Sequence, residues 1–160
     1  MFKSPYPDEQ IPNVSVFDFL FAELSEADAA RTAVVDGTSG AETTFGALKQ
    51  QIELIAGALA GGGLGIGDVV ALHCPNVPAF ASVFHGILRS GATATTINGL
   101  YTAEEIETQL RDSGAKLLFT VGPLLTQAHE GAIAAGLEQD AIIVLDGADG
   151  LGARHVDADL

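Results

Sequence analysis

Hydrophobic and polar positions follow two different periods along this chain. Short runs rich in β-branched residues, such as 68–73 and 116–121, are apolar without polar alternation and lie close to glycines. Between such runs, apolar residues recur three or four positions apart, as they do from Phe45 to Leu59. Uninterrupted apolar strands are typical of a parallel sheet covered on both faces, and the periodic segments between them predict helices.

The pattern predicts a helix, a short strand pair and then repeated strand–helix units. Strands are expected at 32–36, 42–44, 68–73, 92–97, 116–121 and 141–145. Helices are expected at 16–24, 45–61, 77–88, 103–112 and 124–135. Alternating units of this kind predict a doubly wound α/β fold, with a mostly parallel sheet and helices on both faces. The Gly- and Asp-rich residues 147–160 are expected to form a loop.

Two expectations about burial follow from this pattern. The strand segments 69–72, 94–97 and 117–119 should be deeply buried, because they lack polar alternation. The helix at 77–88 has little polar face, so we expect it to leave apolar surface exposed and to favour self-association.

Composition narrows the class of protein. The chain has 160 residues, of which 48% are hydrophobic, and this is enough for one core of ordinary size. Its formal charge of −14, from 21 acidic and 7 basic residues, argues against nucleic acid as a partner. The single Cys74 excludes an internal disulfide framework and a cysteine-based zinc cluster. No apolar run is long enough to span a membrane and no signal peptide is recognisable, so a cytoplasmic protein is expected.

Few residues of this chain are candidates for catalysis or ligand binding. The glycine cluster at 61–67 leads from a helix into a strand, whereas phosphate-binding loops lead from a strand into a helix. The four histidines lack metal-ligand spacing, so no metal site is expected. Tyr101 follows the carboxyl end of a predicted strand, which is where open α/β sheets place ligands. It is therefore the best candidate for a residue close to a substrate.

An ordered set of short motifs resembles a known family. Thr102-Ala103-Glu104-Glu105 has the form of a capping box. The motif positions are Thr44, Phe45, Leu48, Gly67, Asp68, Pro75, Asn76, Gly91, Asn98, Tyr101, Thr102 and Glu105. In this order they resemble the N-terminal motifs of the adenylate-forming acyl-CoA ligases, particularly the 4-coumarate–CoA ligase-like branch. Ala47 and Gly99 depart from the acidic residue and the proline that are usual in the family.

The resemblance implies that residues 1–160 are an incomplete N-terminal part of the large domain of an AMP-binding ligase. The intact enzyme would use ATP, Mg²⁺ and CoA to convert a carboxylic acid into an acyl-adenylate and then an acyl-CoA. The family's phosphate loop and catalytic lysine have no counterpart here, so no catalytic, cofactor-binding or metal-ligating residue is expected in this segment. Its expected partners are the rest of the large domain and the C-terminal domain.

Two alternatives remain at this point. The chain could be a standalone flavodoxin-like or Rossmann-like binding module in which Asp36 and Asp146, at strand ends, serve a ligand. It could also be an interaction domain without chemistry. A reading frame that continues beyond Leu160 into a Ser/Thr/Gly-rich, lysine-containing loop would favour the ligase.

Overall fold

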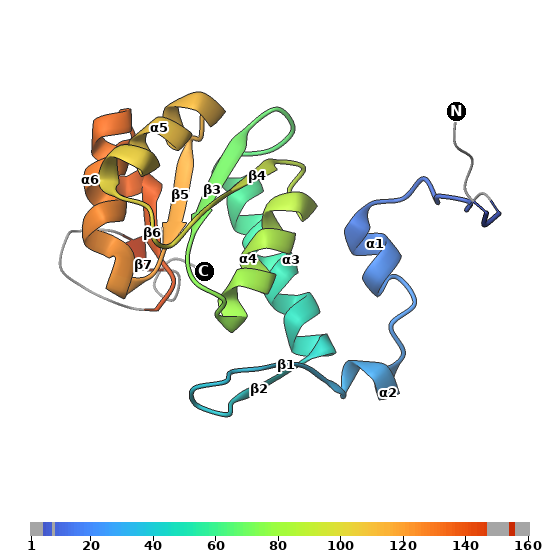
Figure 1. Cartoon of the computed structure of the whole chain (residues 1–160). Helices are drawn as coiled ribbons and strands as arrows, with labels where there is room; N and C mark the ends of the chain where they lie inside the picture. Colours follow the sequence, from blue (N-terminus) through green and yellow to red (C-terminus); the bar gives the residue numbers. More distant parts are fainter. Residues whose placement is uncertain (1–4, 8, 147–153, 156–160) are drawn as a thin grey trace.

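A five-stranded parallel sheet forms the centre of the computed structural model, which describes residues 5–7, 9–146 and 154–155 (Figure 1). Its strands are β3 (Val69–His73), β4 (Thr93–Ile97), β5 (Leu117–Thr120), β6 (Ile142–Val144) and β7 (Arg154–His155). They lie in the order β4-β3-β5-β6-β7, and every neighbouring pair is parallel. Numbered from β3, this is the 2-1-3-4-5 order of flavodoxin-like doubly wound folds.

Helices cover both faces of the sheet. On one face lie α3 (Phe45–Gly61) and α4 (Pro78–Arg89), and on the other α5 (Ala103–Ser113) and α6 (Leu125–Ala135) (Figure 1). Neighbouring residues of β3 point to opposite layers: Val70 and Leu72 pack with the α3–α4 layer, and Ala71 with the α5–α6 layer. All three are fully buried. The predicted doubly wound α/β fold is confirmed.

The edge strand β4 differs from its predicted burial. Ile97 is buried, but Ala94 and Thr95 are only half-buried and Thr96 is exposed, so the deep burial expected for 94–97 is wrong. The physical reason is its position, because β4 pairs only with β3 among the described strands. Gln109 of α5 covers part of this edge, with Nε2 donating to Thr95 Oγ1 and to the Thr96 carbonyl, both at 3.0 Å.

The other two segments follow the prediction more closely. In 69–72, only Val69 is half-buried, and in 117–119 only Leu117. Both residues begin their strands, and the positions after them are buried. β3 and β5 each have neighbours on both sides, so their apolar runs are enclosed by strands as well as by helices.

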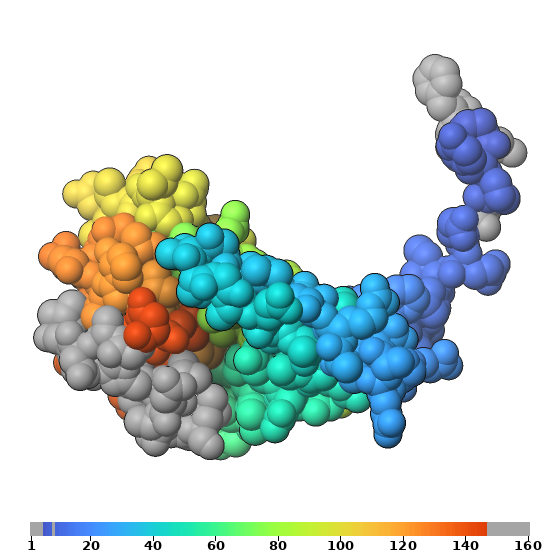
Figure 2. Space-filling view, turned by 90° about the horizontal axis from the view of Figure 1, so that it is seen from below, coloured from blue at the N-terminus to red at the C-terminus, as the bar shows by residue number. Residues whose placement is uncertain are grey.

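The N-terminal part adds two short helices and a hairpin. These are α1 (Val16–Phe21), α2 (Glu26–Ala29), and the antiparallel pair β1 (Thr32–Val35) and β2 (Glu42–Thr44). The helix predicted for 16–24 ends at Phe21, and α2, which begins after its cap Ser25, was not predicted. Phe17 and Phe21 anchor α1 in a cluster with Leu48 and Ile52 of α3. The segment that leads into α1 extends away from the body, at the end opposite α5 and α6 (Figure 2).

The helix predicted to expose apolar surface is largely covered. Val83 and Ile87 of α4 are buried, and Ser82 Oγ donates to Gln51 Oε1 of α3 at 2.6 Å. Gly86 permits the close approach of α3, since a Cβ there would lie 2.5 Å from Ile55 Cγ2. α1 and α3 thus cover part of α4, while Phe80 and Phe84 are half-buried and Leu88 is 37% exposed, so the apolar surface expected on this helix is reduced but not removed. Self-association itself remains a prediction.

The loops after α3 and after β6 contain two defined features. Gly63, which follows the C-cap of α3, has φ of +81°, a left-handed conformation that favours glycine. Within 147–160, where a loop is expected, Arg154 and His155 form β7 and pair with β6. The rest of that range lies outside the described residues. The two 3₁₀ turns are η1 (Gly122–Leu124) and η2 (Gln139–Ala141).

Removing the capping box of α5 should weaken the fold measurably. Thr102 Oγ1 accepts from the Glu105 N–H at 3.3 Å, and Glu105 Oε2 accepts from the Thr102 N–H at 2.8 Å. We expect Thr102→Ala to lower the free energy of unfolding by about 1 kcal/mol in urea denaturation. The control is Thr108→Ala on the same helix, where alanine favours helix and no cap is lost. An equal loss in both variants would contradict this role of the cap.

Candidate functional site

The carboxyl ends of β3, β4 and β5 meet at the point where the chain changes direction across the sheet. The connection from β3 to β4 passes through α4 on one face, and that from β4 to β5 passes through α5 on the other. Open α/β sheets bind ligands in the crevice at such a switch point. A hollow of about 480 Å³ opens there. It is lined by Cys74, Pro75, Asn76, Ile97, Asn98, Gly99, Leu100, Val121, Pro123 and Leu124.

The lining of this hollow is mostly apolar and carries no basic side chain among the described residues. Asn98 Oδ1 accepts from the Leu100 N–H at 3.0 Å and thereby holds the turn after β4. Burial raises the pKa of the Cys74 thiol to about 11, so the thiol stays protonated near neutral pH and is a poor nucleophile. Without lysine or arginine, the hollow offers no counter-charge to the phosphates of a nucleotide.

The described residues provide no metal site beside the hollow. In the described part of the chain, no group of three or more His, Cys, Asp or Glu side chains is arranged to hold a metal ion. The hollow itself therefore fits neither Mg²⁺ nor ATP, and no reaction step can be derived from its residues. The expectation that this segment carries no catalytic, cofactor-binding or metal-ligating residue stays a prediction.

His73, at the carboxyl end of β3, is fully buried. Its Nδ1 lies 3.4 Å from Thr120 Oγ1 on β5, and its Nε2 has no hydrogen-bond partner among the described residues. Burial lowers the pKa of His73, and the backbone of Asn98 acts weakly in the opposite direction. The ring is therefore held in its neutral form beside the switch point.

Tyr101 lies next to the hollow in sequence but does not line it. It is half-buried and packs against the core between α5, α6 and the sheet. Its N–H donates to the Asn98 carbonyl at 3.0 Å, and Gln127 Nε2 donates to its carbonyl at 3.5 Å. The structure thus gives Tyr101 a place in the turn after β4, and its proximity to a substrate stays a prediction.

The remaining motif residues shape turns, caps and core. Thr44 Oγ1 accepts from the Ala47 N–H at 3.2 Å and caps α3, although Ala47 replaces the usual acidic residue. Phe45 and Leu48 pack in the cluster under α1. Gly67 and Gly91 have φ of +91° and +87°, a region that favours glycine. Of the twelve motif positions, only Pro75, Asn76 and Asn98 line the hollow.

An ion pair that the sequence did not reveal joins the starts of β3 and β5. Lys116 Nζ donates to Asp68 Oδ1, and Asp68 Oδ2 accepts from the Gly65 N–H at 2.9 Å. These hydrogen bonds, that from Lys116 first, lower the pKa of Asp68. The motif aspartate therefore fixes the amino edge of the sheet, opposite the hollow.

The two carboxylates of the binding-module alternative both accept hydrogen bonds from backbone N–H groups. Asp36 Oδ1 accepts from the N–H groups of Ser39 and Thr38, at 3.1 and 2.7 Å, and these bonds lower the pKa of Asp36. Asp146 accepts from the Gly122 N–H at 2.8 and 3.0 Å. Asp36 thus holds its own turn, and Asp146 ties the end of β6 to the loop after β5. Both have structural roles, so the standalone module is not favoured.

Sequence reasoning missed several residues that line the hollow. Cys74, Val121 and Pro123 were not singled out, although each lies within three residues of the end of a predicted parallel strand. Combining the ends of 68–73, 92–97 and 116–121 would have placed them together, because the carboxyl ends of parallel strands share one edge.

Two curated proteins and one solved structure are similar to this chain. It is 33% identical to 4-coumarate–CoA ligase 3 of Oryza sativa subsp. japonica, over 99% of this chain and 30% of that protein. It is also 33% identical to 4-coumarate–CoA ligase 4 of Arabidopsis thaliana, over 88% of this chain and 26% of that protein. An anthranilate CoA ligase solved with anthranoyl-AMP matches with a TM-score of 0.75 and 26% identity, covering 86% of this chain and 26% of that one.

The chain thus spans less than a third of the length of these proteins. No helix in the described residues is long and apolar enough to cross a membrane. The profile of the AMP-binding enzyme family matches residues 21–159, almost the whole chain. The resemblance seen in the motifs is confirmed, and the chain is an N-terminal segment that belongs to the AMP-binding enzyme family.

Proposed function

We propose that the intact protein containing this chain is an acid–thiol ligase. Its carboxylic acid substrate would attack the α-phosphate of ATP, releasing pyrophosphate and leaving an acyl-adenylate. The thiol of CoA would then attack the acyl carbon and release AMP. The observation that carries this proposal is the family match over residues 21–159, supported by similarity to CoA ligases in sequence and in structure.

The acid is proposed to be aromatic, in the 4-coumarate–CoA ligase-like manner. Both 4-coumarate–CoA ligases share 33% identity with this chain, and the two similar solved structures are an anthranilate and a benzoate CoA ligase. An oxalate–CoA ligase of Arabidopsis thaliana is also 37% identical over 72% of the chain, so small aliphatic acids belong in the same test. Tyr101 is proposed as a residue of this segment that lies close to the acid.

The role proposed for this segment is structural. The hollow at the switch point has neither basic side chains nor a metal-ligand cluster among its described residues. In-line transfer at a phosphate needs both positive charge and positioning. We therefore propose that ATP, Mg²⁺ and CoA are bound by the rest of the large domain and by the C-terminal domain. We also propose a cytoplasmic location, although one relative is named a peroxisomal ligase.

ATP–pyrophosphate exchange tests the proposal directly. The purified 160-residue chain, shown to be folded by circular dichroism, should give no exchange above buffer with aromatic, fatty or small aliphatic acids. The intact protein should exchange with at least one aromatic acid and release AMP once CoA is added. Exchange by the 160-residue chain would contradict the structural role, and an intact protein without activity on any acid would overturn the proposed reaction.

A further inference from the structure

Helix α1 carries apolar side chains on both its inner and its outer face, with Asp18 as its one charged residue. Phe17 and Phe21 are buried against the body, while Val16, Phe19 and Leu20 are 52%, 68% and 50% exposed. A short surface helix of a globular protein usually keeps its outer face polar, and a helix that is apolar all round is normally buried. The outer face of α1 therefore has the composition of a covered surface.

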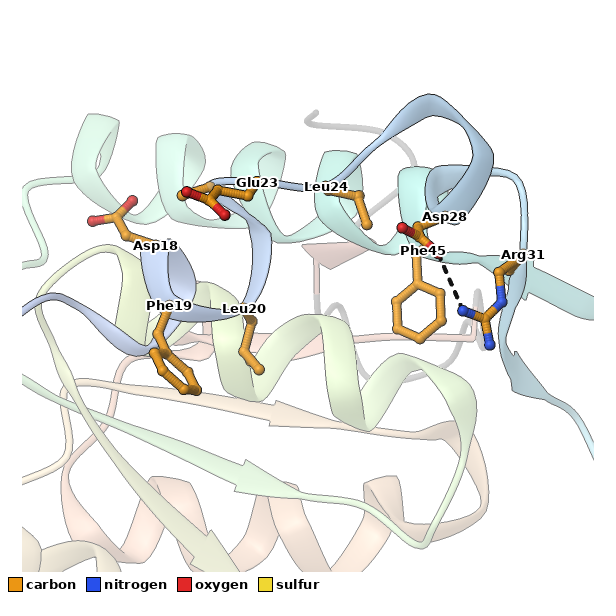
Figure 3. A pocket seen from close by; sticks show the side chains of 9 residues that line it. Asp18, Phe19, Leu20, Glu23, Leu24, Asp28, Arg31 and Phe45 are labelled. Atoms are coloured by element: carbon orange, nitrogen blue, oxygen red, sulfur yellow. Dashed lines mark hydrogen bonds and ion pairs between the residues drawn. The ribbon is translucent and has the colours of Figure 1, made fainter. Parts of the chain in front are cut away.

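A hollow of about 550 Å³ lies beside this face, between α1 and α2. We refer to it as the α1–α2 groove; it is lined by Asp18, Phe19, Leu20, Ala22, Glu23, Leu24, Asp28, Arg31 and Phe45. In Figure 3, Phe19 and Leu20 lie together with Asp18 and Glu23 toward one end of the groove, and Asp28 and Arg31 lie toward the other.

The charge at the rim of the groove is negative. Arg31 is its one basic residue, and Arg31 Nη1 pairs with Asp28 Oδ1 at 3.1 Å. Asp18 and Glu23 have no ion pair in the described part of the chain, so a negative charge remains around an apolar floor. The chain as a whole carries a formal charge of −14. A second copy would bring the same acidic surface and the same repulsive net charge, which disfavours self-pairing here.

We propose that the α1–α2 groove docks a polypeptide segment of a partner protein that carries aliphatic side chains flanked by lysine or arginine. The aliphatic side chains would cover Phe19 and Leu20, removing apolar surface from water. The flanking cations would lie against Asp18 and Glu23, which sets the orientation and speeds the encounter. Such a site is separate from the hollow at the switch point, with which it shares no lining residue.

The test uses a fluorescein-labelled 12-residue peptide with a Leu-Leu-Lys-Lys repeat, titrated with the 160-residue chain at 50 and 300 mM salt. Anisotropy should show saturable binding that weakens at the higher salt, because exposed charges are screened. The same peptide with glutamate in place of lysine should bind at least about tenfold more weakly. Phe19→Ser combined with Leu20→Ser should weaken binding of the lysine peptide by at least about tenfold.

Charge variants distinguish binding in the groove from non-specific attraction of the peptide to the net negative charge of the chain. Asp18→Asn with Glu23→Gln should weaken binding about three- to tenfold. The control, Glu130→Gln with Glu138→Gln, makes the same charge change at exposed positions near α6 and should leave the affinity within about twofold. Equal weakening by both pairs would overturn the proposal in favour of non-specific attraction. Should the serine variant unfold, the two charge pairs still decide between these outcomes.

Two further results would overturn the proposal by identifying another occupant. If sedimentation showed a dimer that Phe19→Ser with Leu20→Ser converts to a monomer, the groove would be a contact between copies. If the peptide bound the 160-residue chain but not the intact protein, the rest of the protein would cover the groove. Binding by both forms, lost in the groove variants alone, is the result that we expect.

Discussion

Gly131→Val is expected to lower the free energy of unfolding by at least about 2 kcal/mol. Gly131 lies on α6 where this helix crosses α5. A Cβ at this position would lie 2.6 Å from the Ala103 carbonyl oxygen and 2.9 Å from Ile106 Cβ and Cγ2. The carbonyl belongs to the backbone and cannot rotate away, so the two helices would have to separate. Urea unfolding followed by circular dichroism gives the loss, provided that the slope with denaturant is unchanged.

The matched control for Gly131→Val is Gly57→Val on α3. Gly57 is also helical, but a Cβ there meets nothing within 4 Å. Since valine has a slightly better helix propensity than glycine, Gly57→Val should change stability by less than about 0.5 kcal/mol. A loss of similar size at both positions would mean that valine is harmful in these helices for reasons other than the close contact of α5 with α6.

Glycines at helix crossings show what the sequence does not reveal. A glycine inside a helical pattern suggests a weak point. Gly86 and Gly131 instead lie where α4 meets α3 and where α6 meets α5, one on each face of the sheet. Gly57 has the same local signal and no such contact. Only the arrangement of the helices distinguishes these positions.

The central strands could be predicted because a strand that is buried on all sides needs an uninterrupted run of apolar residues, which is visible in the sequence. The apolar runs around Val70 and Leu118 contain no polar alternation, and both residues are fully buried. Whether a strand lies at the centre or at the edge of the sheet is harder to read from the sequence. The run that ends at Ile97 is also β-branched, yet β4 lies at the edge and Thr96 is exposed. Threonine favours strands both at the edge and in the interior of a sheet, so the sequence pattern alone did not distinguish the edge strand from the central strands.

Long-range contacts explain the other differences. The apolar character of 77–88 was read correctly, but the cover that α1 provides for α4 depends on contacts such as Arg89 with the Phe17 ring, at 4.6 Å. The candidate site could likewise be predicted only as far as it depends on local sequence. The predicted strand ends were enough to indicate the carboxyl edge of the sheet, where the structure has a hollow. The packing of Tyr101 against α5 and α6, and the bond from Gly122 to Asp146, depend on how distant elements meet.

Acidification from pH 7 to pH 5 should destabilise the chain in part through His73. The pKa of His73 is lowered from its ordinary value of 6.5 by burial. Below about pH 6.5 the unfolded chain therefore takes up a proton that the folded chain resists, and stability falls by up to about 1.4 kcal/mol per pH unit. This contribution is fully present above pH 6.5 and is lost as the pH falls below it.

His73→Leu should remove this part of the pH dependence. Leucine has no buried nitrogen without a partner, so the stability at pH 7 should change little. As the pH falls, the variant should become more stable than the wild type. His129→Gln is the control, because it removes one imidazole from a half-buried position on α6. Asp28, Asp36 and Asp68 do not interfere, because their pKa values in the folded chain are lowered from 3.8. The stability that their ionised forms contribute is lost only in more acidic solution than this. Urea unfolding at pH 7.0, 6.0 and 5.0 measures the difference, and parallel pH profiles for the wild type and His73→Leu would show that His73 is not the group responsible.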